Sequence, residues 1–251
     1  GVMPQGSKVL IEGRKASDNS TVLLRLTDKG ATDTAFGNNG ILALPNSSNY
    51  DYTSVWWENR NDGIYAMGIQ TMGASPASAI IKYSIDGKLD SSFGVSGVLR
   101  VASDTGIELL ADGRIVQSQS SVASDDTLYR IYAKDGKSSV LTDTISQVGL
   151  YDFAPYSPYS SYDEPRFISV QGKKIVLQGW NTETSAPALV RLNENGTVDR
   201  TFGQEGYFDL SDAEQEDVTY DFYNFKITEL DGKFLLTGIK STTPDGEVST
   251  I

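Results

Sequence analysis

The chain has 251 residues, and its 39% hydrophobic and 22% charged residues are the composition of a folded globular protein. Its net charge of −12 disfavours nucleic acids and anionic membrane surfaces as partners. The sequence contains neither cysteine nor histidine, which excludes disulfides, Cys/His zinc sites, thiol nucleophiles and His-dependent triads.

The start of the chain, GVMPQGSKVL, lacks the basic, apolar and cleavage regions of a signal peptide. We expect that any such peptide has been removed or that none existed. No apolar run approaches the ~18 residues that span a bilayer, so no membrane insertion is predicted.

Two kinds of glycine-containing turn recur along the chain. A first turn precedes an apolar run at Gly6, Gly63, Gly113, Gly172 and Gly232. A second turn follows 23 or 24 residues later at Gly30, Gly87, Gly136 and Gly196. This constant spacing predicts five copies of one unit, at approximately residues 1–49, 50–103, 104–150, 151–211 and 212–251, the last one incomplete.

Each unit is predicted to consist of β-strands, because its short runs are rich in Val, Ile, Leu, Tyr and Thr and are bounded by Asp-Gly or Asn-Gly turns. In the second unit, YTSVWWE, IYAMGIQ, AIIKYS and VLRVA give four antiparallel strands. Runs such as VLLRL and AIIKY are apolar at consecutive positions, which indicates strands buried on both faces. Four-stranded sheets stacked in a ring bury both faces, so the predicted fold is an all-β propeller of about five blades in a single domain, 1–251. A β-sandwich is the main alternative.

A five-residue phrase occurs three times, as FGNNG, FGVSG and FGQEG, within the pattern D-x-x-F-G-x-x-G. Its Phe lies 30 residues after the first-turn glycine in each case (6 to 36, 63 to 93, 172 to 202). The Asp, at 33, 90 and 199, can accept backbone N–H bonds, the Phe can fill the space between blades, and the glycines allow sharp bends. We interpret the phrase as a structural corner before the last strand of each blade.

The segment LVRLNENGTVDRTFGQEG (189–206) resembles the bacterial delta-60 repeat, and LLRLTDKGATDTAFGNNG and IIKYSIDGKLDSSFGVSG are similar to it as well. The resemblance implies a β-propeller of a secreted or surface-associated bacterial protein, without characterised catalytic residues. The third unit departs from the pattern, because SSVLTDTIS replaces the Asp and the Phe-Gly. The first unit is expected to lack the strand that elsewhere precedes the first turn.

Aromatic side chains provide the candidate binding site. Trp56 and Trp57 are adjacent on a predicted strand and should face opposite ways. The segment YDFAPYSPYSSYDEP (151–165) is the longest departure from the repeat, and it contains Tyr156, Tyr159 and Tyr162. Together with Trp180, which ends a strand, these tyrosines are the predicted binding residues for a glycan or a protein. Packing of this segment against the ring is the structural alternative.

Three functions remain open: an extracytoplasmic, non-catalytic binding or scaffold module, a carboxylate-based glycan hydrolase or lyase, and a purely structural part of a larger surface protein. No pair of the 33 acidic residues stands out as catalytic, so an enzyme is the less favoured interpretation and no catalytic residue is assigned. The Asp- and Asn-containing turns lack the Glu of a calcium-binding EF-hand loop, so no metal site or cofactor is predicted.

Overall fold

The computed structural model describes residues 1–17, 20–45, 50–51, 55–71, 77–102, 107–120, 127–141, 147–148, 151–152, 168–181, 186–209, 219–230, 233–241 and 248–250. All regular secondary structure within these ranges is β-strand. No helix in the described part of the chain is long and apolar enough to cross a membrane. The fold is therefore all-β, as the sequence predicts.

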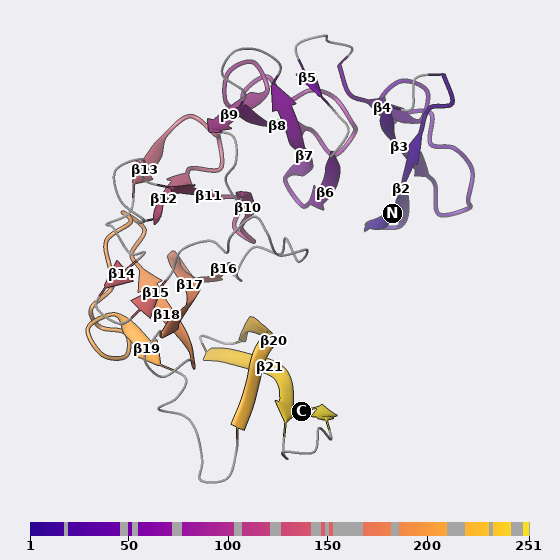
Figure 1. The fold of residues 1–251 in the computed structure, drawn as a ribbon. Coiled ribbons are helices and arrows are strands. Elements are labelled where there is room, and N and C mark those ends of the chain that lie inside the picture. Colours follow the sequence, from indigo (N-terminus) through magenta and orange to yellow (C-terminus); the bar gives the residue numbers. More distant parts are fainter. Residues whose placement is uncertain are drawn as a thin grey trace. The chain divides into compact units, whose positions relative to one another are not determined.

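The described strands form antiparallel sheets that follow the repeats in chain order (Figure 1). The first sheet contains β1 (Val2–Gln5), β2 (Lys8–Arg14), β3 (Thr21–Leu26) and β4 (Ile41–Ala43). The second contains β5 (Tyr50–Asp51), β6 (Trp56–Arg60), β7 (Gly63–Thr71), β8 (Ala77–Tyr83) and β9 (Val98–Ala102). The third contains β10 (Ile107–Leu109), β11 (Ile115–Ser120), β12 (Thr127–Tyr132) and β13 (Ser139–Leu141).

The fourth sheet contains β14 (Gln147–Val148), β15 (Tyr151–Asp152), β16 (Ile168–Gln171), β17 (Lys174–Asn181), β18 (Ala186–Leu192) and β19 (Tyr207–Asp209). The fifth contains β20 (Thr219–Leu230), β21 (Lys233–Ser241) and β22 (Val248–Thr250). The chain divides into two compact units, one of residues 1–104 with 134–137 and the other of residues 105–133 with 138–251.

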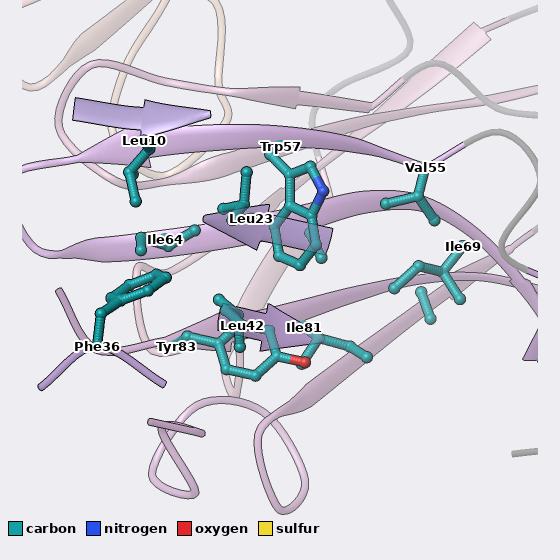
Figure 2. Close-up of a cluster of buried hydrophobic side chains, with 12 residues drawn as sticks. Leu10, Leu23, Phe36, Leu42, Val55, Trp57, Ile64, Ile69, Ile81 and Tyr83 are labelled. Carbon is teal, nitrogen blue, oxygen red and sulfur yellow. The ribbon is translucent and has the colours of Figure 1, made fainter. Parts of the chain in front are cut away.

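Facing sheets within each unit share a core. In the first unit, Leu10 and Leu23 of the first sheet lie in one cluster with Ile64, Ile81 and Tyr83 of the second (Figure 2). In the second unit, side chains of the third and fourth sheets form the equivalent cluster, which includes Val116, Ile131, Ile175, Leu177 and Val190. Strands such as β8 are buried on both faces, which is the arrangement that consecutive apolar residues predict.

The Phe-Gly phrase holds one repeat to the next in the first unit. Phe36 is fully buried, and the Gly37 N–H donates to the Asp86 carbonyl oxygen of the next repeat at 2.9 Å. A Cβ atom on Gly87, in that repeat's second turn, would lie 2.9 Å from Phe36 Cε2. The turn glycine is therefore needed because the ring of the preceding repeat lies against it.

The second repeat holds the third in the same way. Phe93 is buried, the Gly94 N–H donates to the Asp135 carbonyl oxygen at 2.7 Å, and a Cβ atom on Gly136 would lie 2.9 Å from Phe93 Cε2. Phe202 is only half-buried, so complete burial of the corner Phe is confirmed in two of the three corners.

The three corners share one backbone conformation. The Asp carboxylate accepts a backbone N–H bond two residues on in each, from Ala35 at 3.3 Å, Ser92 at 3.1 Å and Thr201 at 3.2 Å. Their non-glycine residues with positive φ are also equivalent: Asn39, Ser96 and Glu205, at 52°, 53° and 52°. The last strand follows directly in each case, so the interpretation of the phrase as a corner is confirmed.

The expectation that the first repeat lacks a leading strand is wrong. Residues Val2–Gln5 form β1, which pairs with β2 so that Pro4 lies opposite Val9. The strand was missed because it is short and contains proline, which lacks an N–H. Since β1 lies at the edge of its sheet, that missing donor costs no ladder hydrogen bond.

The repeats also vary internally more than the constant glycine spacing suggests. In the first and fourth repeats, the strand after the first turn begins with a lysine: Lys8 pairs with Gln5, and Lys174 pairs with Gln171. In the second repeat, Gly63 stands in place of this lysine and pairs with Arg60. The strand β7 thus begins two residues earlier relative to its glycine, and the irregularity between Ala66 and Ile69, where three residues of β7 oppose two of β8, offsets one of these two residues.

The third repeat omits the corner. Residues 133–138 connect β12 directly to β13, and the Ala133 N–H donates to the Ser138 carbonyl oxygen at 2.9 Å. The sheet keeps four strands, so the missing Asp and Phe-Gly shorten a connection without removing a strand.

Candidate functional site

The predicted binding residues divide between described and undescribed parts of the chain. Trp180 lies on β17, where its backbone pairs with Asp152 of β15 and Pro187 of β18. Tyr156, Tyr159 and Tyr162 lie outside the described residues. The binding role of all four remains a prediction.

The adjacent tryptophans of β6 face opposite ways, as predicted. The Trp57 side chain is buried in the core of the first unit, with its ring 6.2 Å from that of Tyr83. Trp56 is 43% exposed. It is therefore an accessible aromatic side chain on β6.

A polar cluster that the sequence did not predict lies beside the corner of the first repeat. Asp33 accepts hydrogen bonds from Lys8 Nζ at 2.7 Å and Arg25 Nε at 2.9 Å. The Arg25 guanidinium is only 3% exposed and lies 4.5 Å above the centre of the Phe36 ring. Its Nη1 also donates to Gln5 Oε1 at 2.8 Å.

Arg25 additionally joins the first repeat to the second. Its Nη1 donates to the Ile85 carbonyl oxygen at 2.7 Å, and its Nη2 lies 3.1 Å from Asp86 Oδ1. The hydrogen bond from Lys8, supported by Arg25, lowers the pKa of Asp33 despite burial. The carboxyl group is therefore held ionised, which suits an ion-pair role and is unfavourable for a general acid.

The fourth repeat contains the same cluster. Asp199 accepts hydrogen bonds from Lys174 and from Arg191 Nε, the latter at 2.7 Å. Arg191 Nη1 donates to Gln171 Oε1 at 2.7 Å, and the guanidinium lies 4.7 Å above the Phe202 ring. Burial raises the pKa of Asp199, but the hydrogen bonds from Lys174 and Thr201 outweigh it and lower the pKa.

The second repeat arranges different residues around an equivalent cation. Lys82 takes the place of Arg25, since Tyr65 pairs with Lys82 as Leu10 pairs with Arg25. Lys82 Nζ donates to Asp62 Oδ2 at 2.8 Å and lies 3.9 Å from Asp90 Oδ2. The Tyr65 hydroxyl donates to the same Asp62 oxygen at 2.8 Å.

The charged side chains of these clusters pair with one another, so they are not available as catalytic groups. Each described cation in them contacts a carboxylate, and the described residues contain no group of three or more acidic side chains that could hold a metal ion. Burial raises the pKa of Tyr65 to about 12, so this phenol is not an activated one. The arrangement is that of structural ion pairs between strands and corners.

Sequence reasoning missed these clusters because their members are far apart in the chain. A signal was nevertheless present: Gln, Lys, Arg and Asp recur at the same offsets from Gly6 and Gly172, as Gln5 and Gln171, Lys8 and Lys174, Arg25 and Arg191, and Asp33 and Asp199.

A protein-family model, described as a β-propeller domain of unknown function (DUF5122), matches residues 173–202. The matched segment begins just before Lys174 and ends at Phe202, so it spans the Lys–Arg–Asp–Phe cluster of the fourth repeat. No curated protein matches the chain. Together with the all-β sheets, the match supports a β-propeller repeat fold with propeller-like blades.

Proposed function

We propose that the chain is a β-propeller of about five blades of the bacterial delta-60 repeat family, and that it acts outside the cytoplasm as a non-catalytic binding or scaffold module. The three D-x-x-F-G-x-x-G corners and the match to a β-propeller family support the assignment. The ligand is a neutral glycan or a protein surface, since the net charge of −12 disfavours polyanions.

One observation carries the binding proposal. In the second repeat, β5 and β6 both pair with β7 and are joined by residues 52–55. In the fourth repeat, β15 and β16 both pair with β17, but residues 153–167 join them. The Tyr-rich segment is thus an insertion at a place where another repeat has a short link, and the blade itself does not require it.

The position of the insertion also relates it to Trp180. The backbone of Trp180 pairs with Asp152, the residue immediately before the insertion. Segments that connect the strands of a scaffold carry binding residues more often than the strands themselves do. Tyr and Trp combine an apolar ring with a polar tip, which suits contact with sugars or protein surfaces.

A glycan array and capture of secreted-protein partners provide the test. The variant with Tyr156, Tyr159 and Tyr162 all replaced by Ala should lose at least about 90% of the signal, because several modest stacking contacts are removed together. Its melting temperature should stay within about 2 °C of the wild type, the range expected for surface substitutions.

The matched control is Trp56→Ala, which removes an exposed aromatic side chain from another repeat and should leave binding unchanged. If the triple variant unfolds, the segment is packing and the chain is better described as a structural repeat. If wild-type protein degrades an array glycan, the hydrolase or lyase alternative replaces the binding module.

A further inference from the structure

The third repeat retains one cation of the polar cluster after losing the rest of it. In the first and fourth repeats, Lys8 and Lys174 are the first residues of the strand after the first turn. In the third repeat, Arg114 occupies this place: its carbonyl oxygen accepts from the Leu110 N–H at 2.8 Å, and Ile115 begins the strand. Arg114 is therefore the positional equivalent of the two lysines.

The partners of those lysines are absent from the third repeat. Val116 pairs with Ile131 as Leu10 pairs with Arg25, so a buried isoleucine replaces the arginine. By the same register Leu110, also buried, replaces Gln5. The corner that supplies Asp33 in the first repeat has no counterpart, because residues 133–138 connect the strands directly.

Arg114 is consequently left without the carboxylate that its equivalents bind. Its Nε donates to Asp112 Oδ2 at 2.7 Å, and its side chain is only 13% exposed. Both Nη1 and Nη2 are buried and have no hydrogen-bond partner among the residues that the structure describes. A guanidinium has five N–H groups, so the four on Nη1 and Nη2, two of which form its terminal edge, remain unpaired there.

A carboxylate is the chemical group that matches the terminal edge of the Arg114 guanidinium. Buried charged N–H groups are unfavourable unless an acceptor meets them, and the two terminal nitrogens of arginine match the two oxygens of a carboxylate. A carboxylate oxygen is also what the equivalent lysines bind in the first and fourth repeats. The adjacent Asp112 carboxylate and the acidic chain disfavour a dianion such as phosphate.

We propose that Arg114 of the third repeat binds the carboxylate group of a small organic acid through Nη1 and Nη2. This site uses none of the aromatic residues of the proposed glycan or protein site. When bound, the ligand carboxylate would pair with Arg114 as the corner Asp carboxylate pairs with Lys8 and Lys174 in the first and fourth repeats.

Acetate is the probe, compared with chloride at equal ionic strength in thermal unfolding and isothermal titration calorimetry. Wild type should show a saturable rise in melting temperature with acetate, and Arg114→Met should show none. The control is Arg200→Met, since Arg200 is 75% exposed and paired with Glu205 at 2.9 Å. It should respond as wild type does. An equal acetate response in all three proteins would overturn the proposal.

A second variant keeps the test decisive if Arg114→Met does not fold. Asp112→Asn removes a neighbouring negative charge from an exposed turn and should strengthen acetate binding several-fold. Nitrogen-15 spectra of the arginine side chains in wild type should show the Arg114 signals moving with acetate. If these signals do not move, or if Asp112→Asn binds acetate no better, the guanidinium is satisfied by the chain itself and the proposal is wrong.

Discussion

In the first repeat Asp33 accepts hydrogen bonds from two cations, whereas in the second repeat Asp90 lies 3.9 Å from Lys82, which bonds Asp62 instead. The difference originates in one position. Lys8 supplies the second cation in the first repeat, but its register equivalent in the second repeat is Gly63, which has no side chain. The cluster of the second repeat therefore contains one cation fewer, and Lys82 bonds the Asp62 carboxylate of the neighbouring turn.

The apolar part of the two corners does not vary in this way. Phe36 and Phe93 are both buried, and Gly37 and Gly94 both donate to a carbonyl oxygen of the following repeat. The comparison indicates that the repeated phrase encodes the contact between repeats, while the ion pairs adapt to local sequence. Removal of a shared element should therefore cost more than removal of a variable one.

The largest effect is expected for the corner ring. Phe36→Ala should reduce the free energy of unfolding by ~3–5 kcal/mol, because it leaves a cavity at a fully buried position. Phe202→Ala should cost clearly less, since Phe202 is half-buried. Urea unfolding followed by tryptophan fluorescence measures both. A loss below about 1 kcal/mol for Phe36→Ala would show that the ring does not hold the repeats together.

A smaller difference in stability loss is expected between alanine substitutions at two glycines with positive φ. Gly30→Ala places a Cβ in open space at φ +77° and should cost ~1–2 kcal/mol from backbone strain alone. Gly37→Ala, at φ +51°, also brings its Cβ into the Ile41 carbonyl oxygen and should cost more. The two variants are compared by the same urea titration. Equal losses would mean that the corner backbone can relax around the new methyl group.

The ion pairs provide a third contrast. Asp33→Asn removes the buried carboxylate of Arg25 and leaves it only the exposed Asp86, so it should destabilise the protein more than Asp90→Asn, since the Asp90 side chain is 29% exposed. Because the pKa of Asp33 is lowered from 3.8, its stabilisation is present above the unfolded value and is lost as the pH falls through the folded one.

The stability gap between wild type and Asp33→Asn should therefore close as the pH falls below about 4. Urea titrations at a series of pH values between 2 and 7 measure this gap. A gap that stays constant down to pH 2 would mean that the Asp33 charge contributes nothing.

Much of this architecture follows from local signals. The strands, the turns and the corner conformation depend on residues close together in the chain, such as the Asp-Gly pairs and the F-G-x-x-G phrase. The polar clusters were not predicted, because Lys8, Arg25 and Asp33 meet only once three separate segments are aligned in register. The early start of β7 was missed for the same reason, since the unchanged glycine spacing conceals both this two-residue shift and the one-residue irregularity further along the strand.

The candidate site shows a different limit. The Tyr-rich insertion is recognisable from sequence because it interrupts a repeat, but a sequence pattern cannot show where its side chains lie. Arg114 is the opposite case: it is an ordinary arginine after a turn in sequence, and it becomes notable only when its buried Nη1 and Nη2 are compared with the equivalent lysines.

The smallest effect is expected at Tyr65, which is particular to the second repeat, because Leu10 occupies the equivalent position in the first. Burial, assisted by the bond to Asp62, raises the pKa of Tyr65 to about 12. The phenol is thus favoured in its neutral form in the folded state. Its stabilisation is complete below the unfolded value of ~10 and is lost as the pH rises from there towards 12.

Tyr65→Phe should cost about 1 kcal/mol at pH 7, the contribution of one hydrogen bond, and should make unfolding less sensitive to pH between 10 and 12. Absorbance titration at ~295 nm, where tyrosinate absorbs, should show one late-titrating tyrosine fewer in the variant. If wild type and variant lose stability in parallel over this range, Tyr65 ionises at its ordinary pH and the Tyr65–Asp62–Lys82 arrangement is not a closed cluster. Parallel loss would also mean that Tyr65 adds nothing to the Lys82–Asp62 ion pair of the second repeat.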